Sequence, residues 1–172
     1  MSACSKVLFA LAGVALAAAP AAAAPVAAPT QPPARALLLI PLTLTKVQDL
    51  HFGTIVPSTT TAGFVSINAA TGARTASAGL TLMPADVGQR GRFAGAGTPN
   101  QQVIMALTPP AELTNLAGDT ITVLAMNLDG PTTRTIAADH TFFVGVGGVI
   151  FLTANQAEGL YSATYDLTAD YQ

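Results

Sequence analysis

Few residues in this sequence have the types and spacing that catalysis or metal binding requires. The only histidines, His51 and His140, lie close to a carboxylate in the stretches "DLH" and "ADH". A zinc site needs several nitrogen or sulfur ligands at close spacing, and nothing extends either stretch into such a set. Both histidines are therefore predicted to be surface or edge residues, and no metal site is expected.

Other motifs for chemistry are equally weak. No G-x-S-x-G motif is present, so a hydrolase with that nucleophile turn has no support. "GAGTPN" and "VGVGGV" resemble phosphate loops, but the first lacks a third glycine and a following helix, and the second lies inside a predicted hairpin. The carboxylates are spread singly, without the spacing of a calcium loop. The sequence predicts no catalytic residue and no cofactor, and a non-enzymatic protein is the favoured interpretation.

Charge argues against nucleic acid as a partner. The 172 residues contain seven basic and nine acidic side chains, and the basic ones are scattered. Binding to nucleic acid requires clustered lysine and arginine. Arg90 and Arg92 alternate on one short segment, where they are interpreted as solvating a strand face.

The N-terminus has the pattern of an export signal. Lys6 precedes an apolar stretch from Val7 to about Ala19, and small residues follow. Residues 1–24 are predicted to be a signal peptide cut near Ala23 or Ala24, leaving no membrane span. The alternative is an uncleaved anchor, which the alanine-rich, proline-interrupted composition disfavours. Cys4, the only cysteine, precedes the apolar stretch, whereas a lipoprotein cysteine would follow it. We expect export to the periplasm of a Gram-negative bacterium, and then to the cell surface or medium.

The rest of the chain is predicted to be a short leader followed by strands. Residues 25–35 are rich in proline and alanine and are predicted to be a flexible leader. Residues 36–172 are predicted to form one domain of about eight or nine short strands, separated by Gly, Pro, Thr and Asn. Without helices for parallel crossovers, the strands should be antiparallel. The predicted fold is an immunoglobulin-like antiparallel β-sandwich, with a hairpin in "HTFFVGVGGVIFLTA" that turns at Gly147-Gly148.

Apolar alternation is strongest at the two ends of this domain. Near the N-terminus one strand face would carry Ala36, Leu38, Ile40, Leu42 and Leu44. At the C-terminus one face would carry Gly159, Tyr161, Tyr165, Leu167 and Tyr171. These ends either pair within their own sandwich, or the N-terminal strand completes the sheet of another subunit by β-strand addition. In the second case the C-terminal strand would form a wall of the receiving groove.

Two resemblances bear on this choice. The C-terminal strand resembles that of chaperone–usher pilins, because Gly159 is fourteenth from the end and Tyr171 is penultimate, with Tyr161, Tyr165 and Leu167 between them. This resemblance implies pairing with a periplasmic chaperone. Many pilins hold an intrachain disulfide, which this chain cannot form.

The second resemblance covers nearly all of residues 41–171. "PLTLTKVQDLHFGTIVP", "GARTASAGLTL", "FAGAGTPNQQV" and "VGGVIFLTANQAEGLYSATYDLTADY" are similar to a bacterial secreted family known as domain of unknown function 4402. It implies a signal peptide, a β-sandwich and a surface or pilus-like use, with no known chemistry.

Three functions follow in order of preference. The first is an exported pilin-like structural or adhesion subunit, joined to other subunits by donation of its N-terminal strand. The alternative is a self-contained monomeric secreted binding module, whose N-terminal strand lies in its own sandwich. The third is an enzyme or carbohydrate-active domain, which the scattered polar residues support least.

Overall fold

The structure, a computed structural model, describes residues 26, 30, 33–77 and 79–172. The predicted signal peptide, residues 1–24, and most of the predicted leader, residues 25–35, lie outside the described residues. Residues 38–172 form one compact unit. The described part of the chain contains no helix, and hence none long and apolar enough to cross a membrane.

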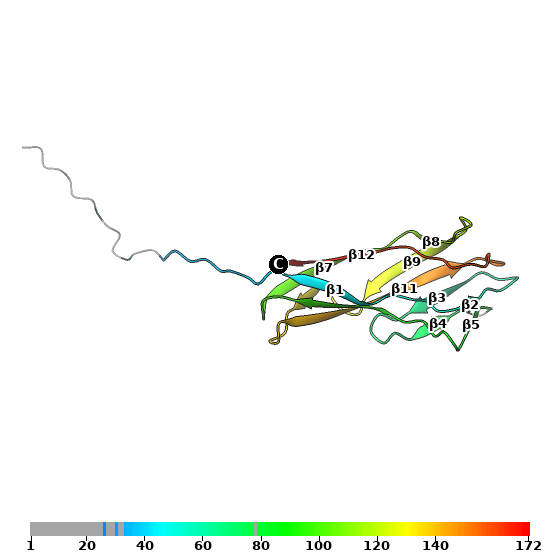
Figure 1. The fold of residues 1–172 in the computed structure, drawn as a ribbon, viewed down its shortest axis with the longest axis horizontal. Coiled ribbons are helices and arrows are strands. Elements are labelled where there is room, and N and C mark those ends of the chain that lie inside the picture. The colour runs from blue at the N-terminus through cyan, green and yellow to red at the C-terminus, as the bar shows by residue number, and fades with distance from the viewer. Residues whose placement is uncertain (1–25, 27–29, 31–32, 78) are drawn as a thin grey trace, which may run out of the picture. The chain divides into compact units, whose positions relative to one another are not determined.

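Twelve strands make up the described fold, and all of their pairings are antiparallel (Figure 1). This confirms the prediction of an all-β protein built from antiparallel sheets. The strands are β1 (Thr43–Gln48), β2 (Ile55–Val56), β3 (Gly63–Ile67), β4 (Arg74–Ala76), β5 (Thr81–Leu82), β6 (Gly91–Ala96), β7 (Gln102–Thr108), β8 (Glu112–Thr114), β9 (Thr120–Leu128), β10 (Thr133–Thr135), β11 (Thr141–Leu152) and β12 (Asp166–Tyr171).

The largest sheet has seven strands and is organised around β11. The strand order is β1-β6-β11-β3-β4, and β9 lies on β11 with β8 beyond it. Val146 pairs with Gly91 of β6 on one edge of β11 and with Leu128 of β9 on the other. β6 and β3 therefore follow one another along the first edge. The smaller sheets are β10-β7-β12 and β2-β5, and the sheets include a curled half-barrel.

β11 shows that the predicted hairpin at Gly147-Gly148 is wrong. The strand continues through both glycines for 12 residues. A side chain at Gly147 would collide with the backbone of Ile67, at the end of the neighbouring strand β3, and of Ala69 just after it. Glycine is therefore required here for the close approach of another segment of backbone and not for a turn.

Two apolar clusters fill the fold. The terminal core, so named because both predicted end strands reach it, consists of Val103, Met105, Ile136, Phe142 and Val144. The groove core consists of Val65, Ile121, Ile150 and Leu152. Alternation explains the first cluster, because β7 buries Val103 and Met105 and exposes Ile104 between them.

The glycines of β6 and Gly97 just after it explain how a glycine-rich segment can lie against the terminal core. A Cβ atom at Gly95 would collide with the ring of Phe142, and one at Gly97 would lie 2.5 Å from the hydroxyl of Tyr171. Gly91 likewise leaves room for the Tyr165 hydroxyl. The segment "GRFAGAG" is thus glycine-rich because aromatic rings pack across it.

Candidate functional site

The two histidines lie at opposite ends of β6 and do not form a joint site. His51 forms a backbone bridge with Gln89, and its Nδ1 lies 3.4 Å from Oδ1 of Asp86. His140 lies in a turn with φ of 69°, and its Nδ1 is 3.2 Å from the carbonyl oxygen of Gly97. No group of three or more metal-ligating side chains occurs in the part of the chain that the structure describes.

Asp86 has a defined local environment beside His51. The hydroxyl of Thr54 donates a hydrogen bond of 2.8 Å to its carboxylate. This hydrogen bond, aided by the nearby His51, holds the pKa of Asp86 below its ordinary value against the opposing effect of desolvation. The Thr54–Asp86 pair therefore stabilises a loop and keeps one negative charge at this end of the domain.

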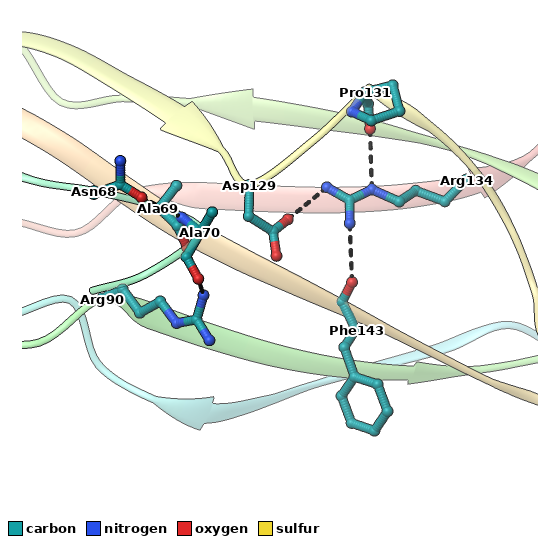
Figure 2. Close-up of polar contacts among 8 residues, drawn as sticks. All are labelled: Asn68, Ala69, Ala70, Arg90, Asp129, Pro131, Arg134 and Phe143. Atoms are coloured by element: carbon teal, nitrogen blue, oxygen red, sulfur yellow. Dashed lines mark hydrogen bonds and ion pairs between the residues drawn. The ribbon is translucent and has the colours of Figure 1, made fainter. Parts of the chain in front are cut away.

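Two arginines are directed at the protein's own backbone (Figure 2). Arg90 donates to the carbonyl oxygens of Ala69, at 3.0 Å, and of Ala70. It therefore holds the turn between β3 and β4 instead of solvating a strand face as expected, whereas Arg92 is exposed on β6.

The second arginine holds the turn between β9 and β10. Arg134 donates to the carbonyl oxygens of Pro131 and Phe143, at 3.0 and 3.1 Å, and pairs with Asp129 at 2.6 Å (Figure 2). Its side chain is 17% exposed. Both guanidinium groups thus satisfy backbone carbonyls, which is a structural task.

The predicted N-terminal strand divides into two parts with different surroundings. Leu42 and Leu44 are half-buried and pack against the terminal core of their own domain. Thr43 and Thr45 pair with Ala96 and Ala94 of β6. This C-terminal half of the segment is an ordinary edge strand of the seven-stranded sheet.

Ile40 marks the boundary between the two parts. The Tyr171 hydroxyl donates to the Ile40 carbonyl oxygen and accepts the backbone N–H of Thr98, both at 2.7 Å. The Ile40 N–H in turn donates to the Thr98 hydroxyl at 2.7 Å. The penultimate residue of the chain thus fixes the start of the N-terminal strand.

The residues before Ile40 are exposed. Leu37 and Leu38 are 77% and 85% exposed, and Ala36 is exposed as well. Isolated exposed leucines are common, but a contiguous apolar segment usually marks an interaction site.

The predicted C-terminal strand is shorter than expected. Pairing with β7 begins only at Asp166, and Leu167 and Tyr171 reach the terminal core. Gly159, Tyr161 and Tyr165 precede the strand. They lie in a stretch joined to β8 only through the bridge of Ser162 with Thr114.

The preceding residues line a cavity instead, which we call the edge groove. Its volume is 680 Å³, and its lining is mostly apolar. Its floor consists of side chains from β8, β9 and β11: Leu113, Ile121, Val123, Met126, Ile150 and Leu152. One wall is the chain from Leu50 to Ile55, and the other is the chain from Gln156 to Ala163, continued by Tyr165.

The edge groove gathers three of the predicted C-terminal residues, Gly159, Tyr161 and Tyr165, and none of the predicted N-terminal ones. Sequence reasoning missed its floor and its first wall. Alternation in "TITVLAMNL" indicates that Ile121 and Val123 face inward, but not that they face an opening. Polar groups lie among the lining residues, chiefly His51, Asp86 and Glu158. Such a site suits an apolar, extended ligand better than bond-breaking chemistry.

Comparisons with known proteins place the chain in a family. No curated protein and no solved structure gave a significant match. The family described as "Domain of unknown function (DUF4402)" matches residues 42–171, which include both core clusters, both walls of the edge groove and β12. Since this match covers most of the chain, the protein belongs to the DUF4402 family.

Proposed function

We propose that this protein is an exported, pilin-like structural or adhesion subunit that is joined to its neighbours by donation of its N-terminal apolar segment. In this proposal residues 1–24 are a removed signal peptide, and residues 25–35 are a flexible leader. The domain is an immunoglobulin-like β-sandwich that works at the cell surface or outside the cell.

The observation that carries the proposal is the exposure of the apolar segment that immediately precedes β1. Leu37 and Leu38 are largely exposed, whereas Leu42 and Leu44 are anchored in the protein's own domain. The donated segment is therefore proposed to be residues 36–39, shorter than the 36–44 strand that the sequence favours. Each fully exposed leucine or isoleucine that becomes buried contributes about 1.5–3 kcal/mol, so this segment can hold two subunits together.

An unpaired strand edge supports the same proposal. β12 pairs with β7, and no second strand pairs with it among the described residues. Exposed edges favour strand addition, and secreted subunits need protection until they assemble. A periplasmic chaperone is proposed as the partner that covers the unassembled subunit.

One observation favours a second function, that of a self-contained secreted binding module. The start of the domain forms contacts within the same domain, through Ile40, Leu42 and Leu44. The Tyr171 hydroxyl links the C-terminus to Ile40. A domain closed in this way folds without a neighbour. In that case the exposed leucines serve another purpose, and the purified protein stays monomeric.

Deletion of residues 33–39 from the full-length chain separates these functions. The deletion leaves β1 and the Ile40 hydrogen bonds in place, so export and folding should be unchanged. Electron microscopy of sheared cell-surface material should then show filaments for the unmodified chain and none for the deletion variant. Filaments of normal length from the deletion variant would contradict the proposal.

A further inference from the structure

From the geometry of the edge groove we infer that it receives an extended apolar strand from a second copy of this chain, namely residues 36–39. This inference rests on the proposed function and adds the place at which the donated segment binds. It is carried by the free backbone edge on one side of the groove, by the apolar floor of the groove and by the length of the segment.

The first wall of the edge groove has little free backbone. His51 exchanges both backbone hydrogen bonds with Gln89, at 2.9 and 2.7 Å. The carbonyl oxygens of Phe52 and Thr54 accept hydrogen bonds from the Arg74 guanidinium, and β2 already pairs with β5. This wall therefore bounds the groove and leaves strand addition to the second wall.

The second wall, in contrast, presents free backbone groups to the groove. Ser162 exchanges both backbone hydrogen bonds with Thr114 of β8, each at 3.0 Å. Alternate residues of an extended chain direct their N–H and C=O groups to opposite sides. Its neighbours Tyr161 and Ala163 therefore direct their N–H and C=O groups to the side away from β8. Both of these residues line the groove.

The Ser162 stretch is an outer edge of the seven-stranded sheet, beyond β8, β9 and β11. The Leu50 wall adjoins another part of the same sheet through the bridge of His51 with Gln89, and both walls line one cavity. A strand added to the Ser162 stretch can form backbone hydrogen bonds with Tyr161 and Ala163 and cover the apolar floor.

The side chains of the N-terminal segment complement the lining of the groove. Ala36 and Leu38 would lie on one face of an extended strand, suited to a floor that includes Val123, Ile150 and Leu152. Arg35 precedes the apolar run, and Asp86 and Glu158 are the carboxylates that line the groove. Apolar contact and charge therefore favour the same occupant.

The segment is too short to enter the groove of its own chain, so its binding site is on a second copy. Ile40 is held by Tyr171, and β1 then runs from Thr43 towards the groove wall at Leu50. Ten residues separate Ile40 from Leu50, about 33 Å of extended chain. Leu38 reaches at most about 7 Å from Ile40. The segment therefore cannot enter its own groove while the Tyr171 contact is intact, but it can enter that of a neighbour.

Disulfide cross-linking in the full-length chain tests this placement. All variants carry Cys4→Ser, so that only introduced cysteines react. The test variant combines Leu38→Cys with Ala163→Cys, on the groove wall. The matched control combines Leu38→Cys with Leu124→Cys, because Leu124 is exposed on β9 beside the floor residue Val123 and is not among the lining residues.

After mild oxidation, the test variant should give a ladder of covalent multimers on non-reducing gels, and the control should give at least tenfold less. If unmodified chains form multimers that require residues 33–39 but Ala163→Cys does not cross-link above the control, the groove is not the receiving site and the proposed function still stands. If unmodified chains form no multimers, the proposed function fails, and this inference fails with it.

Discussion

At the scale of single residues, hydroxyl groups of two tyrosines have opposite roles. The Tyr171 hydroxyl has two hydrogen-bond partners, Thr98 and Ile40, and connects the C-terminus to the start of β1. The Tyr165 hydroxyl is buried against β6 and has no partner in the described part of the chain. The rings of both residues are half-buried, so substitution by phenylalanine isolates the hydroxyl in each case.

Tyr171→Phe should lower the free energy of unfolding by about 1 kcal/mol, because two backbone groups lose a partner. It should also increase hydrogen exchange at the amide of Thr98, which donates to the Tyr171 hydroxyl. Urea unfolding and exchange measured by NMR check this prediction. Unchanged exchange at Thr98 would show that the Tyr171 contact does not hold the start of β1.

Tyr165→Phe should instead raise the free energy of unfolding, because it removes a buried polar group without a partner. Burial, with a smaller contribution from Asp49, raises the pKa of Tyr165 above its ordinary value. The folded state therefore retains this proton more tightly than the unfolded state does. The retention of this proton on Tyr165 contributes to the free energy of unfolding below about pH 10. That contribution is lost as the pH rises through the folded-state pKa of Tyr165.

Urea unfolding between pH 7 and pH 11.5 measures this effect. The unmodified protein should lose stability above about pH 10, and the loss should be smaller in Tyr165→Phe. Identical alkaline profiles would mean that other groups cause the loss.

At the scale of elements, local alternation predicted strands well. β3, β7 and β9 alternate in burial along their own lengths, as strands with one face on a core do. Two predicted features were wrong because their cause lies elsewhere in the chain. Gly147 in β11 leaves room for the backbone of Ala69, and the stretch before Asp166 lacks the β7 pairing that continues along β12.

Gly147→Ala tests the reinterpretation of β11. Its new methyl group would meet backbone atoms, which cannot rotate away as a side chain can. The free energy of unfolding should fall by about 1–3 kcal/mol, as is typical of overpacked sites.

Gly130→Ala is the control, because the nearest atom to its Cβ would be the end of the Arg134 side chain at 3.4 Å. That variant should stay within about 0.5 kcal/mol of the unmodified protein. Equal urea midpoints for the two variants would be incompatible with the close backbone approach at Gly147.

At the scale of the whole molecule, the apolar edge groove, lined by segments far apart in the sequence, is the feature that could not be predicted. Ile121 and Val123 lie on either side of Thr122, an alternation that any strand with one buried face shows. Only the approach of two walls more than one hundred residues apart, such as Leu50 and Tyr161, turns part of their surroundings into a cavity. The sequence did indicate which segments would matter, since both ends carry the longest apolar alternation.

The central claim is that the exposed segment before β1 joins one subunit to the next. Leu38→Asp tests it most directly, because Leu38 is exposed and its replacement should leave the urea midpoint unchanged. Leu116→Asp is the control, since Leu116 is fully exposed in the turn after β8.

The decisive measurement is the molar mass of the three purified chains by light scattering over a range of concentrations. The account predicts multimers for the unmodified chain and for Leu116→Asp, and a folded monomer for Leu38→Asp. Multimers of equal size from Leu38→Asp, or a monomeric unmodified chain, would contradict it.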